Sequence, residues 1–170
     1  MIFSKWFPKH GFKSLLFFAA GLILGGGSVF LAAFFYGRAE LIREEPCTLP
    51  YELAVKLLPE RASALGWSVR SVPCGLPPAV PGKRISVFEI CSRQYATAIL
   101  SPEESRKTAS ILPCKVAIYE RDSRVWISRL NGELVSRLLG GQFRWIFRRN
   151  ILPEQSIMFS DLLCGKRSSR

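Results

Sequence analysis

Two cysteines, Cys91 and Cys114, are the residues of this chain whose positions point most directly to chemistry. Cys91 ends the run ISVFEIC at residues 85–91, and Cys114 directly precedes the run KVAIYER at residues 115–121. Both runs are rich in β-branched and aromatic residues, which is typical of β-strands. If the two strands are antiparallel neighbours, the end of one lies beside the start of the other, so the two sulfur atoms come within bridging range.

Three roles for this cysteine pair are open. Outside the cytoplasm, a disulfide closing about 23 residues would stabilise the fold by roughly 3 kcal/mol. Two buried free thiols would instead behave as small hydrophobic side chains within strands. A reactive redox or sulfur-handling pair needs exposed thiols near positive charge, which Arg93 and Lys115 could supply. We expect the two cysteines to lie close together, and neither to be an exposed nucleophile.

The residue sets of common enzymes and metal sites are missing from the sequence. No C-x-x-C pair occurs among the five cysteines, and the single histidine, His10, precedes a long apolar run. We therefore expect no metal site and no cofactor. No Ser–His or Cys–His pair, G-x-S-x-G motif, P-loop or dinucleotide fingerprint is present, so we expect no catalytic residue. Glu89 and Glu120 are more typical of paired or surface charges than of an acid–base couple.

An uncharged run, LLFFAAGLILGGGSVFLAAFFY, covers residues 15–36. As a helix these residues would span roughly 33 Å, which matches a bilayer hydrocarbon core of about 30 Å. A cleaved signal is the alternative, but its apolar core is usually about 7 to 15 residues long. Lys5, Lys9 and Lys13 precede the run without any acid, whereas both signs of charge follow it. The sequence therefore predicts a single-pass inner (cytoplasmic) membrane protein, with its amino terminus inside and its soluble domain in the periplasm or outside.

Small residues form one stripe of this predicted membrane helix: Gly21, Gly25, Ser28 and Ala32. Such a stripe allows a second helix to pack closely, which would give a homodimer through the membrane helix. Small residues are also common in membrane helices without any such role, and the sequence leaves both interpretations open.

The soluble part is basic. Residues 37–170 contain 21 Lys and Arg, which is the 24 of the whole chain minus three lysines, against all 13 acids, so the net charge is +8. This balance favours anionic partners. A domain outside the cytoplasm would not meet nucleic acid, and no known nucleic-acid recognition motif is present. Anionic lipid head groups are therefore the nearer candidate partner.

The segment FRWIFRR at residues 143–149 mixes aromatic and basic side chains. Four of its residues are candidates for a membrane-surface contact: Arg144, Trp145, Arg148 and Arg149. The alternative is a last helix that packs Phe143, Ile146 and Phe147 onto a sheet and leaves its arginines in solvent.

Local patterns predict alternating helices and strands in the soluble part. A helix is expected from about residue 53 to Gly66, kinked or divided at Pro59, followed by a strand at 67–72 and a proline-rich loop. Residues 85–91 read as a central strand, and a capping box at 101–104 starts a helix toward residue 110. Residues 115–121 and 124–130 have the form of a hairpin that turns at 122–123.

A final helix is predicted after the hairpin, with Asn131 as its cap. Its apolar stripe would consist of Leu134, Val135, Leu138 and Leu139. An antiparallel sheet covered by helices on one face is the expected outcome. The chain would then divide into a cytoplasmic basic segment (1–14), a transmembrane helix (15–36), a juxtamembrane segment (37–46), a soluble α+β domain (47–165) and a basic tail (166–170).

Four blocks of sequence follow one another in a familiar order: EIC at 89–91, YATAIL at 95–100, LPCKVAIYE at 112–120 and WISRLN at 126–131. Together with Gly66 and Trp67, they resemble the domain of unknown function 302 family, and most closely its subgroup with an amino-terminal membrane helix. The resemblance covers roughly residues 50–150. It implies an α+β fold whose antiparallel sheet is backed by two main helices, preceded here by one transmembrane helix, and it implies no particular activity.

Two functions follow from these observations. The first is a membrane-tethered, non-catalytic binding or accessory domain on the outer face of the membrane, with an unknown ligand. The alternative is a thiol-dependent redox or sulfur-handling protein that uses Cys91 and Cys114. Thiol reactivity distinguishes the two functions, because only the second requires an accessible thiolate.

Overall fold

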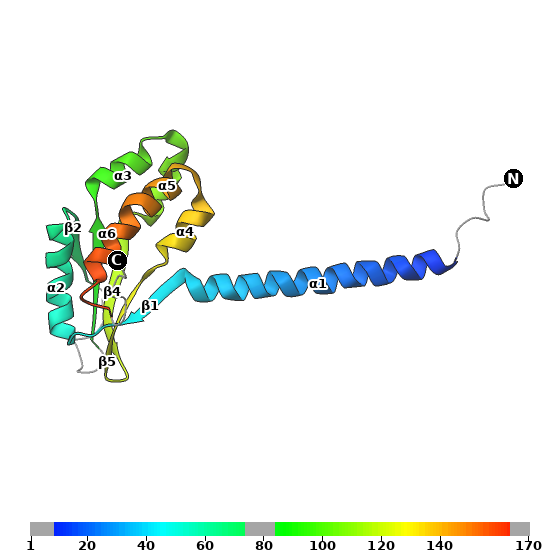
Figure 1. Cartoon of the computed structure of the whole chain (residues 1–170), viewed down its shortest axis with the longest axis horizontal. Helices are drawn as coiled ribbons and strands as arrows, with labels where there is room; N and C mark the ends of the chain where they lie inside the picture. The colour runs from blue at the N-terminus through cyan, green and yellow to red at the C-terminus, as the bar shows by residue number, and fades with distance from the viewer. Residues whose placement is uncertain (1–8, 74–83, 164–170) are drawn as a thin grey trace. The chain divides into compact units, whose positions relative to one another are not determined.

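The structure is a computed structural model that describes residues 9–73 and 84–163, with side chains from residue 17 onward (Figure 1). Several features of the sequence lie outside this range: Lys5, His10 as a side chain, Cys74, the loop at 74–83, Cys164 and the basic tail. The chain divides into two compact units, residues 1–40 and 41–170, and each is described by itself.

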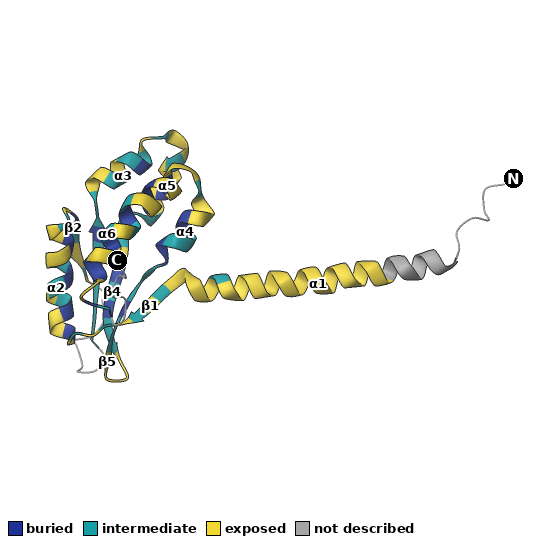
Figure 2. Cartoon of the chain, in the orientation of Figure 1, coloured by how far each residue is buried: buried dark blue, intermediate teal, exposed yellow. Residues whose placement is uncertain are grey.

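The first unit consists of helix α1, Lys9–Leu41, which continues to the first residue of the second unit. Within α1, the stretch Phe17–Leu41 has a mean hydropathy of 2.0, and none of its most apolar window is buried (Figure 2). Among the described residues, this is the one helix long and apolar enough to cross a membrane. Gly25, Gly26 and Gly27 do not interrupt it.

The second unit is built on a five-stranded sheet with the order β1-β5-β4-β3-β2, in which every neighbouring pair is antiparallel. The strands are β1 (Ile42–Pro46), β2 (Ser68–Val72), β3 (Ile85–Cys91), β4 (Cys114–Arg121) and β5 (Arg124–Leu130). The predicted α+β class with an antiparallel sheet is therefore confirmed. Strand β3 has the predicted bounds and lies inside the sheet.

The hairpin of β4 and β5 turns at Asp122 and Ser123, as predicted. Both residues have positive φ, 52° and 58°. Two consecutive positive φ angles belong to the type I′ turn, whose twist matches that of the paired strands. The hairpin thereby fixes the register that sets Ile118 opposite Ile127.

One face of the sheet carries the core. Phe88, Ile90, Val116, Ile118 and Ile127 alternate along three neighbouring strands and are at most 5% exposed. Helices complete this core and contribute buried residues to the same cluster; Figure 2 colours the buried residues of sheet and helices dark blue. The helices are α2 (Tyr51–Ala64), α3 (Arg93–Leu100), the 3₁₀ segment η1 (Glu103–Ile111), α4 (Gly132–Leu139), α5 (Gly141–Ile146), the π turn η2 (Phe147–Ile151) and α6 (Leu152–Phe159).

Three segments differ from the sequence analysis. Helix α2 runs through Pro59 without dividing, because Leu58 and Ala62 are fully buried and hold the helix on both sides of the proline. Residues 103–111 form a 3₁₀ segment, whereas an α-helix, α3, precedes them at a position the patterns did not indicate. Residues 42–46, placed in the juxtamembrane segment by the sequence, form edge strand β1.

The carboxyl-terminal helices also depart from the prediction of one final helix. Asn131 caps α4 as expected, since its side chain accepts a hydrogen bond from Leu134 N at 3.2 Å. Gly140 and Gly141, both with positive φ, end α4 after only two turns. Leu138 and Leu139 are 73% and 43% exposed, so their predicted place in the core was wrong.

Candidate functional site

The two candidate cysteines meet at the end of β3, where the chain enters α3. Antiparallel pairing sets Ile90 opposite Cys114, so Cys91 follows one residue beyond this pair. Cys91 and Cys114 line one small cavity together with Trp67, Tyr95 and other side chains. Both cysteines are half-buried free thiols. The structure thus brings the two residues together without a disulfide between them.

Both thiols are held in the protonated form. Burial raises the pKa of the Cys114 thiol to about 11, and the neighbouring Cys91 contributes to the same shift. Burial also raises the pKa of Cys91. Because the thiolate is the nucleophile, these shifts make both side chains poor nucleophiles at neutral pH.

Behind this cavity, one carboxylate is hydrogen-bonded to side chains from two other parts of the chain. Glu154 of α6 accepts hydrogen bonds from Trp67 Nε1 at 2.6 Å and from the Tyr95 hydroxyl. Trp67, just before β2, and Tyr95 of α3 also meet edge to face, with ring centroids 6.1 Å apart. The bond to Glu154 raises the pKa of Tyr95. We call Glu154, Trp67 and Tyr95 the clamp, and it holds in place two side chains that line the cysteine cavity, Trp67 and Tyr95.

No pattern in the sequence indicated a role for Glu154. It is 87 residues from Trp67 and 59 from Tyr95 along the chain. Periodicity and local motifs relate residues within a few turns, so no local signal connects these three side chains. The Gly66–Trp67 pair, noted for the family resemblance, was the nearest indication.

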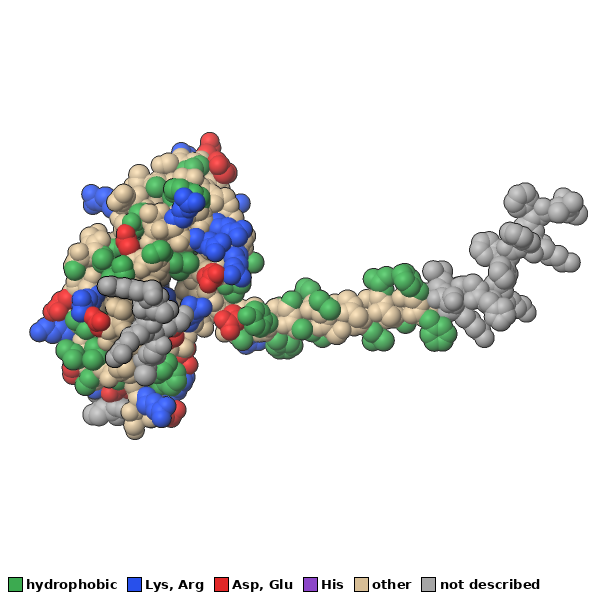
Figure 3. All heavy atoms as spheres, viewed as in Figure 1, with side chains coloured by type: hydrophobic (Ala, Val, Ile, Leu, Met, Phe, Trp, Pro, Cys, Tyr) green, Lys and Arg blue, Asp and Glu red, His purple; other side chains and the backbone are tan. Residues whose placement is uncertain are grey.

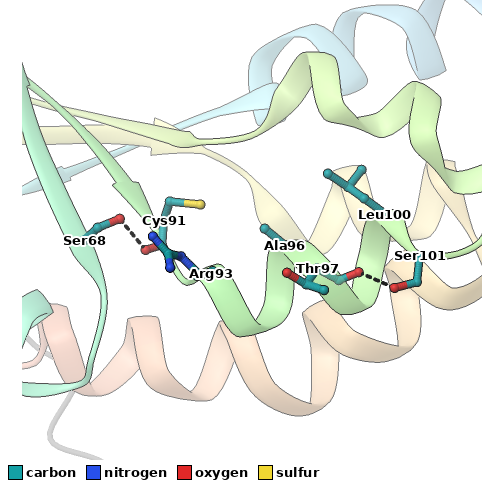
Figure 4. A pocket seen from close by; sticks show the side chains of 7 residues that line it. All are labelled: Ser68, Cys91, Arg93, Ala96, Thr97, Leu100 and Ser101. Carbon is teal, nitrogen blue, oxygen red and sulfur yellow. Dashed lines mark hydrogen bonds between the residues drawn. The ribbon is translucent and has the colours of Figure 1, made fainter.

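An open groove of about 500 Å³ lies beside Cys91, between the end of β3 and α3 (Figure 4). In Figure 4 the side chains of Cys91 and Leu100 point into the space between strand and helix. Its lining consists of Ser68, Cys91, Arg93, Ala96, Thr97, Leu100 and Ser101. Pockets for small ligands are typically about 300–1,000 Å³, so the groove has a suitable size.

The polar groups of the groove are few. Ser68 donates its hydroxyl to the carbonyl of Cys91 at 2.9 Å, and Ser101 donates to the carbonyl of Thr97 at 2.7 Å. Both hydroxyl protons are therefore already used within the protein. Arg93 is exposed and forms no ion pair within the described residues. The lining suits a small molecule with an apolar body and a negative group near Arg93.

The carboxylates near the cysteines are ion-paired. Glu89 contacts Arg70 and also Lys115, whose Nζ is 3.9 Å from its Oε1. Glu120 binds Arg84 at 2.7 Å, near the far end of β4 from Cys114. Neither glutamate lines the groove or the cysteine cavity. Within residues 9–73 and 84–163, no cluster of three metal-ligating side chains occurs.

The structure agrees with the packed-helix interpretation of the segment 143–149, and the membrane-surface contact stays a prediction. Phe143, Ile146 and Phe147 are at most 4% exposed and belong to the core, where the rings of Phe143 and Phe147 stack at 4.7 Å. The four candidate membrane-surface residues are all exposed: Arg144, Trp145, Arg148 and Arg149. The segment therefore separates its apolar and basic side chains onto two sides.

The predicted helix-packing stripe is exposed along α1: Gly21, Gly25, Ser28 and Ala32. A Cβ atom added to Gly21 or Gly25 would meet nothing within 4 Å. The Ser28 hydroxyl donates to the carbonyl of Gly25 at 2.9 Å, which satisfies it within the helix.

Comparison with known proteins supports the fold and the family resemblance. The family model described as Domain of unknown function DUF302 matches residues 80–141, which include both candidate cysteines, α3 and the hairpin. A similar solved structure is that of the uncharacterized conserved protein DUF302 from Bacillus stearothermophilus. The likeness has a TM-score of 0.56 at 18% identity and covers 71% of this chain and 97% of that chain. No curated protein matches the chain.

Proposed function

We propose, taking the DUF302 domain as the premise, that this chain is a membrane-tethered, non-catalytic binding protein whose domain faces the outside of the cytoplasmic membrane. The membrane tether is supported by α1. No residue in the most apolar part of its stretch Phe17–Leu41 is buried within the protein. Large side chains such as Phe17 and Phe30, 78% and 70% exposed, would face water without a bilayer. Contiguous apolar surface of this extent is typical of membrane contact.

The outward orientation rests on the charges that flank α1. Lysines precede the apolar stretch, whereas Arg38 and Glu40 accompany its other end. Positive residues are retained on the cytoplasmic side, so residues 41–170 should be exported. A reporter enzyme that is active only outside the cytoplasm, fused after Arg170, should be active. Activity from a cytoplasm-specific reporter at the same place would reverse the topology.

The binding role rests on the groove beside Cys91 and on the protonated state of both thiols. A groove with one cation and little other free polar chemistry can hold a ligand, and it offers no acid, base or thiolate for catalysis. Mild extraction of the full chain from membranes, followed by native mass spectrometry, should show a retained small molecule.

Two matched substitutions on α3 locate that molecule. Ala96→Leu fills the groove and should abolish retention, because Ala96 lines it. Gln94→Leu adds an apolar side chain at an exposed position of α3 outside the lining and should preserve retention. Equal retention by both variants would place the ligand elsewhere.

The thiol-dependent alternative has one supporting observation, the shared cavity of Cys91 and Cys114. Its requirement is a reactive thiol. Alkylation of the native chain at pH 7, compared with Cys91→Ser and Cys114→Ser variants, distinguishes the two functions. Slow alkylation at both positions supports the binding role, whereas rapid modification of either would favour the redox role.

A homodimer through α1 stays a prediction from its stripe of small residues. Gly25→Leu would place a large side chain in the middle of that stripe and prevent close helix contact. Cross-linking in membranes should lose a dimer in this variant and retain it with Leu24→Ile, which leaves the stripe unchanged.

A further inference from the structure

Exposed arginines and apolar side chains gather on the surface of α4, α5 and η2, and the half-buried Arg43 of β1 adjoins them. We call this the arginine surface: Arg43, Arg137, Leu138, Leu139, Arg144, Trp145, Arg148 and Arg149. Figure 3 shows Lys and Arg side chains gathered over the region that α4 and α5 occupy in Figure 1. Trp145 is 54% exposed and Leu138 is 73% exposed, so large apolar side chains stand among these cations. The Arg149 guanidinium lies 5.4 Å from the centre of the Trp145 ring.

The arginine surface begins close to Leu41, the first residue of the second unit. The carbonyl of Leu41, the last residue of α1, accepts a hydrogen bond from the backbone N–H of Asn131 at 2.9 Å. Asn131 is the cap of α4, and the eight residues of α4 rise about 12 Å along their axis. Leu138 and Leu139, at the end of α4, are therefore separated from Leu41 by about the length of this helix.

Arginines of β1, α4 and η2 act on one carboxylate in the first turn of α4. Arg137 binds Glu133 through a 2.6 Å hydrogen bond, which is the main cause of the lowered pKa of Glu133. Arg148 and Arg43 act on the same carboxylate through their charges. Arg43, only two residues beyond Leu41, and Arg148 of η2 therefore both lie within electrostatic range of Glu133.

The arginine surface carries a strong excess of positive charge. Three of its five arginines, Arg43, Arg137 and Arg148, act on the carboxylate of Glu133, and the five arginines with this one carboxylate have a formal charge of +4 (five minus one). Arg144, Arg148 and Arg149 form no ion pair with any described residue. These arginines lie beside exposed Leu and Trp side chains. A bilayer surface offers phosphate groups to the arginines and, just below them, acyl chains to the apolar side chains.

We propose that the arginine surface binds the head groups of anionic phospholipids in the membrane that holds α1. This inference rests on the proposed membrane tether. Guanidinium groups bind phosphates through paired hydrogen bonds, while Trp145 and the two leucines enter the head-group boundary. Because the anchor confines the domain to the bilayer, a weak contact suffices to keep this surface on the lipid.

The fluorescence of Trp145 tests the proposal in the full chain. The chain is placed in nanodiscs of brominated phosphatidylcholine, alone or with about one-third phosphatidylglycerol. Quenching of Trp145 is the difference between the native chain and Trp145→Phe, which removes the contribution of the other tryptophans. We expect quenching at least about twofold stronger in the anionic discs, because only these contain a lipid with net negative charge.

Two charge variants complete the experiment. Changing Arg144, Arg148 and Arg149 to Gln should reduce the Trp145 quenching in anionic discs to its level in neutral discs. Changing Arg106, Lys107 and Arg124 to Gln removes the same charge from other exposed positions and should leave the quenching unchanged. Equal loss in both variants would reduce the effect to net charge and overturn the specific surface.

Two further outcomes separate this inference from the tether. A chain that co-elutes with the discs but shows no Trp145 quenching retains its anchor and contradicts the lipid-binding surface. Quenching that is equal in neutral and anionic discs contradicts the recognition of anionic head groups. A chain that does not enter discs at all contradicts the tether, and with it this proposal.

Discussion

The groove beside Cys91 and the arginine surface belong to one compact unit but have opposite chemistry. The groove is hollow and largely apolar, and its serine hydroxyls already donate to backbone carbonyls. The arginine surface consists mainly of exposed cations and large apolar side chains, and three of its arginines form no ion pair within the described residues. A hollow with little free polar chemistry suits one small molecule, whereas scattered exposed cations suit an extended anionic surface.

The two regions also depend on the sequence in different ways. Half of the arginine surface arises locally, because 143–149 alternates core and exposed residues within two helical turns, while Arg43 joins it from the distant strand β1. The groove arises from segments far apart, since Ser68, Cys91 and Ser101 come from different elements. Substitutions of buried residues that several elements share should therefore lower the stability of the fold. Substitutions of exposed cations should change binding alone.

The largest predicted effect separates the two sides of the segment 143–149. Phe147→Ala removes a 4% exposed ring that stacks on Phe143, and should lower the free energy of unfolding by about 3–5 kcal/mol. Arg148→Ala, the next residue, should change it by no more than about 0.5 kcal/mol because its side chain is exposed. Urea unfolding of both variants measures the contrast. Similar losses would mean that Arg148 is also part of the core.

A smaller effect is expected at the clamp behind the cysteine cavity. Glu154→Gln removes the negative charge that accepts hydrogen bonds from Trp67 Nε1 and the Tyr95 hydroxyl. Because bonds to a charged group are worth about 1.5–3 kcal/mol, we expect a loss of about 2 kcal/mol. The same unfolding measurement on Glu60→Gln, which makes the same chemical change at an exposed position of α2, is the control. Unchanged stability of Glu154→Gln would contradict the clamp.

Cys114→Ser should cost about 1 kcal/mol, because a hydroxyl replaces a thiol in largely apolar surroundings. The pH dependence gives a sharper result. Folding raises the pKa of Cys114 from the ordinary value of 9.0 to about 11, so the fold favours the neutral thiol. This contribution is complete below pH 9 and is lost as the pH rises from 9 toward 11.

The stability difference between the native chain and Cys114→Ser should accordingly shrink above pH 9, as measured by urea unfolding across that range. Cys47→Ser is a second test of the same cause, because burial also raises the pKa of the Cys47 thiol, so its stability difference should shrink above pH 9 as well. A stability difference that grows with pH would contradict burial as the cause of the shift.

Local signals predicted much of the sheet. The hairpin turn, the bounds of β3 and the Asn131 cap each depend on a few neighbouring residues, and all agree with the structure. Strand β1 was not recognised, because IREEP lacks an apolar alternation and is a strand only through its pairing with β5. Leu138 and Leu139 fit a helical stripe but are exposed, since two glycines end α4 before a core could cover them.

The candidate site was predictable only in part. The approach of Cys91 and Cys114 follows from antiparallel pairing of adjacent strands, which the two apolar runs already suggested. The groove depends on α3, and the clamp depends on Glu154 of α6, both of which are placed by tertiary packing. The burial of Phe143, Ile146 and Phe147 and the exposure of the arginines in 143–149 follow the helical spacing of the segment, which the sequence already offered as one of two interpretations.

The central claim is that α1 holds this domain on a membrane, and flotation of the full chain with vesicles after alkaline carbonate washing tests it most directly. Carbonate removes proteins bound only through charge, whereas an inserted helix stays with the lipid. We predict that the full chain floats with the vesicles and that a chain beginning at Leu41, the start of the second unit, does not float after the same wash. Release of the full chain by carbonate would contradict the account.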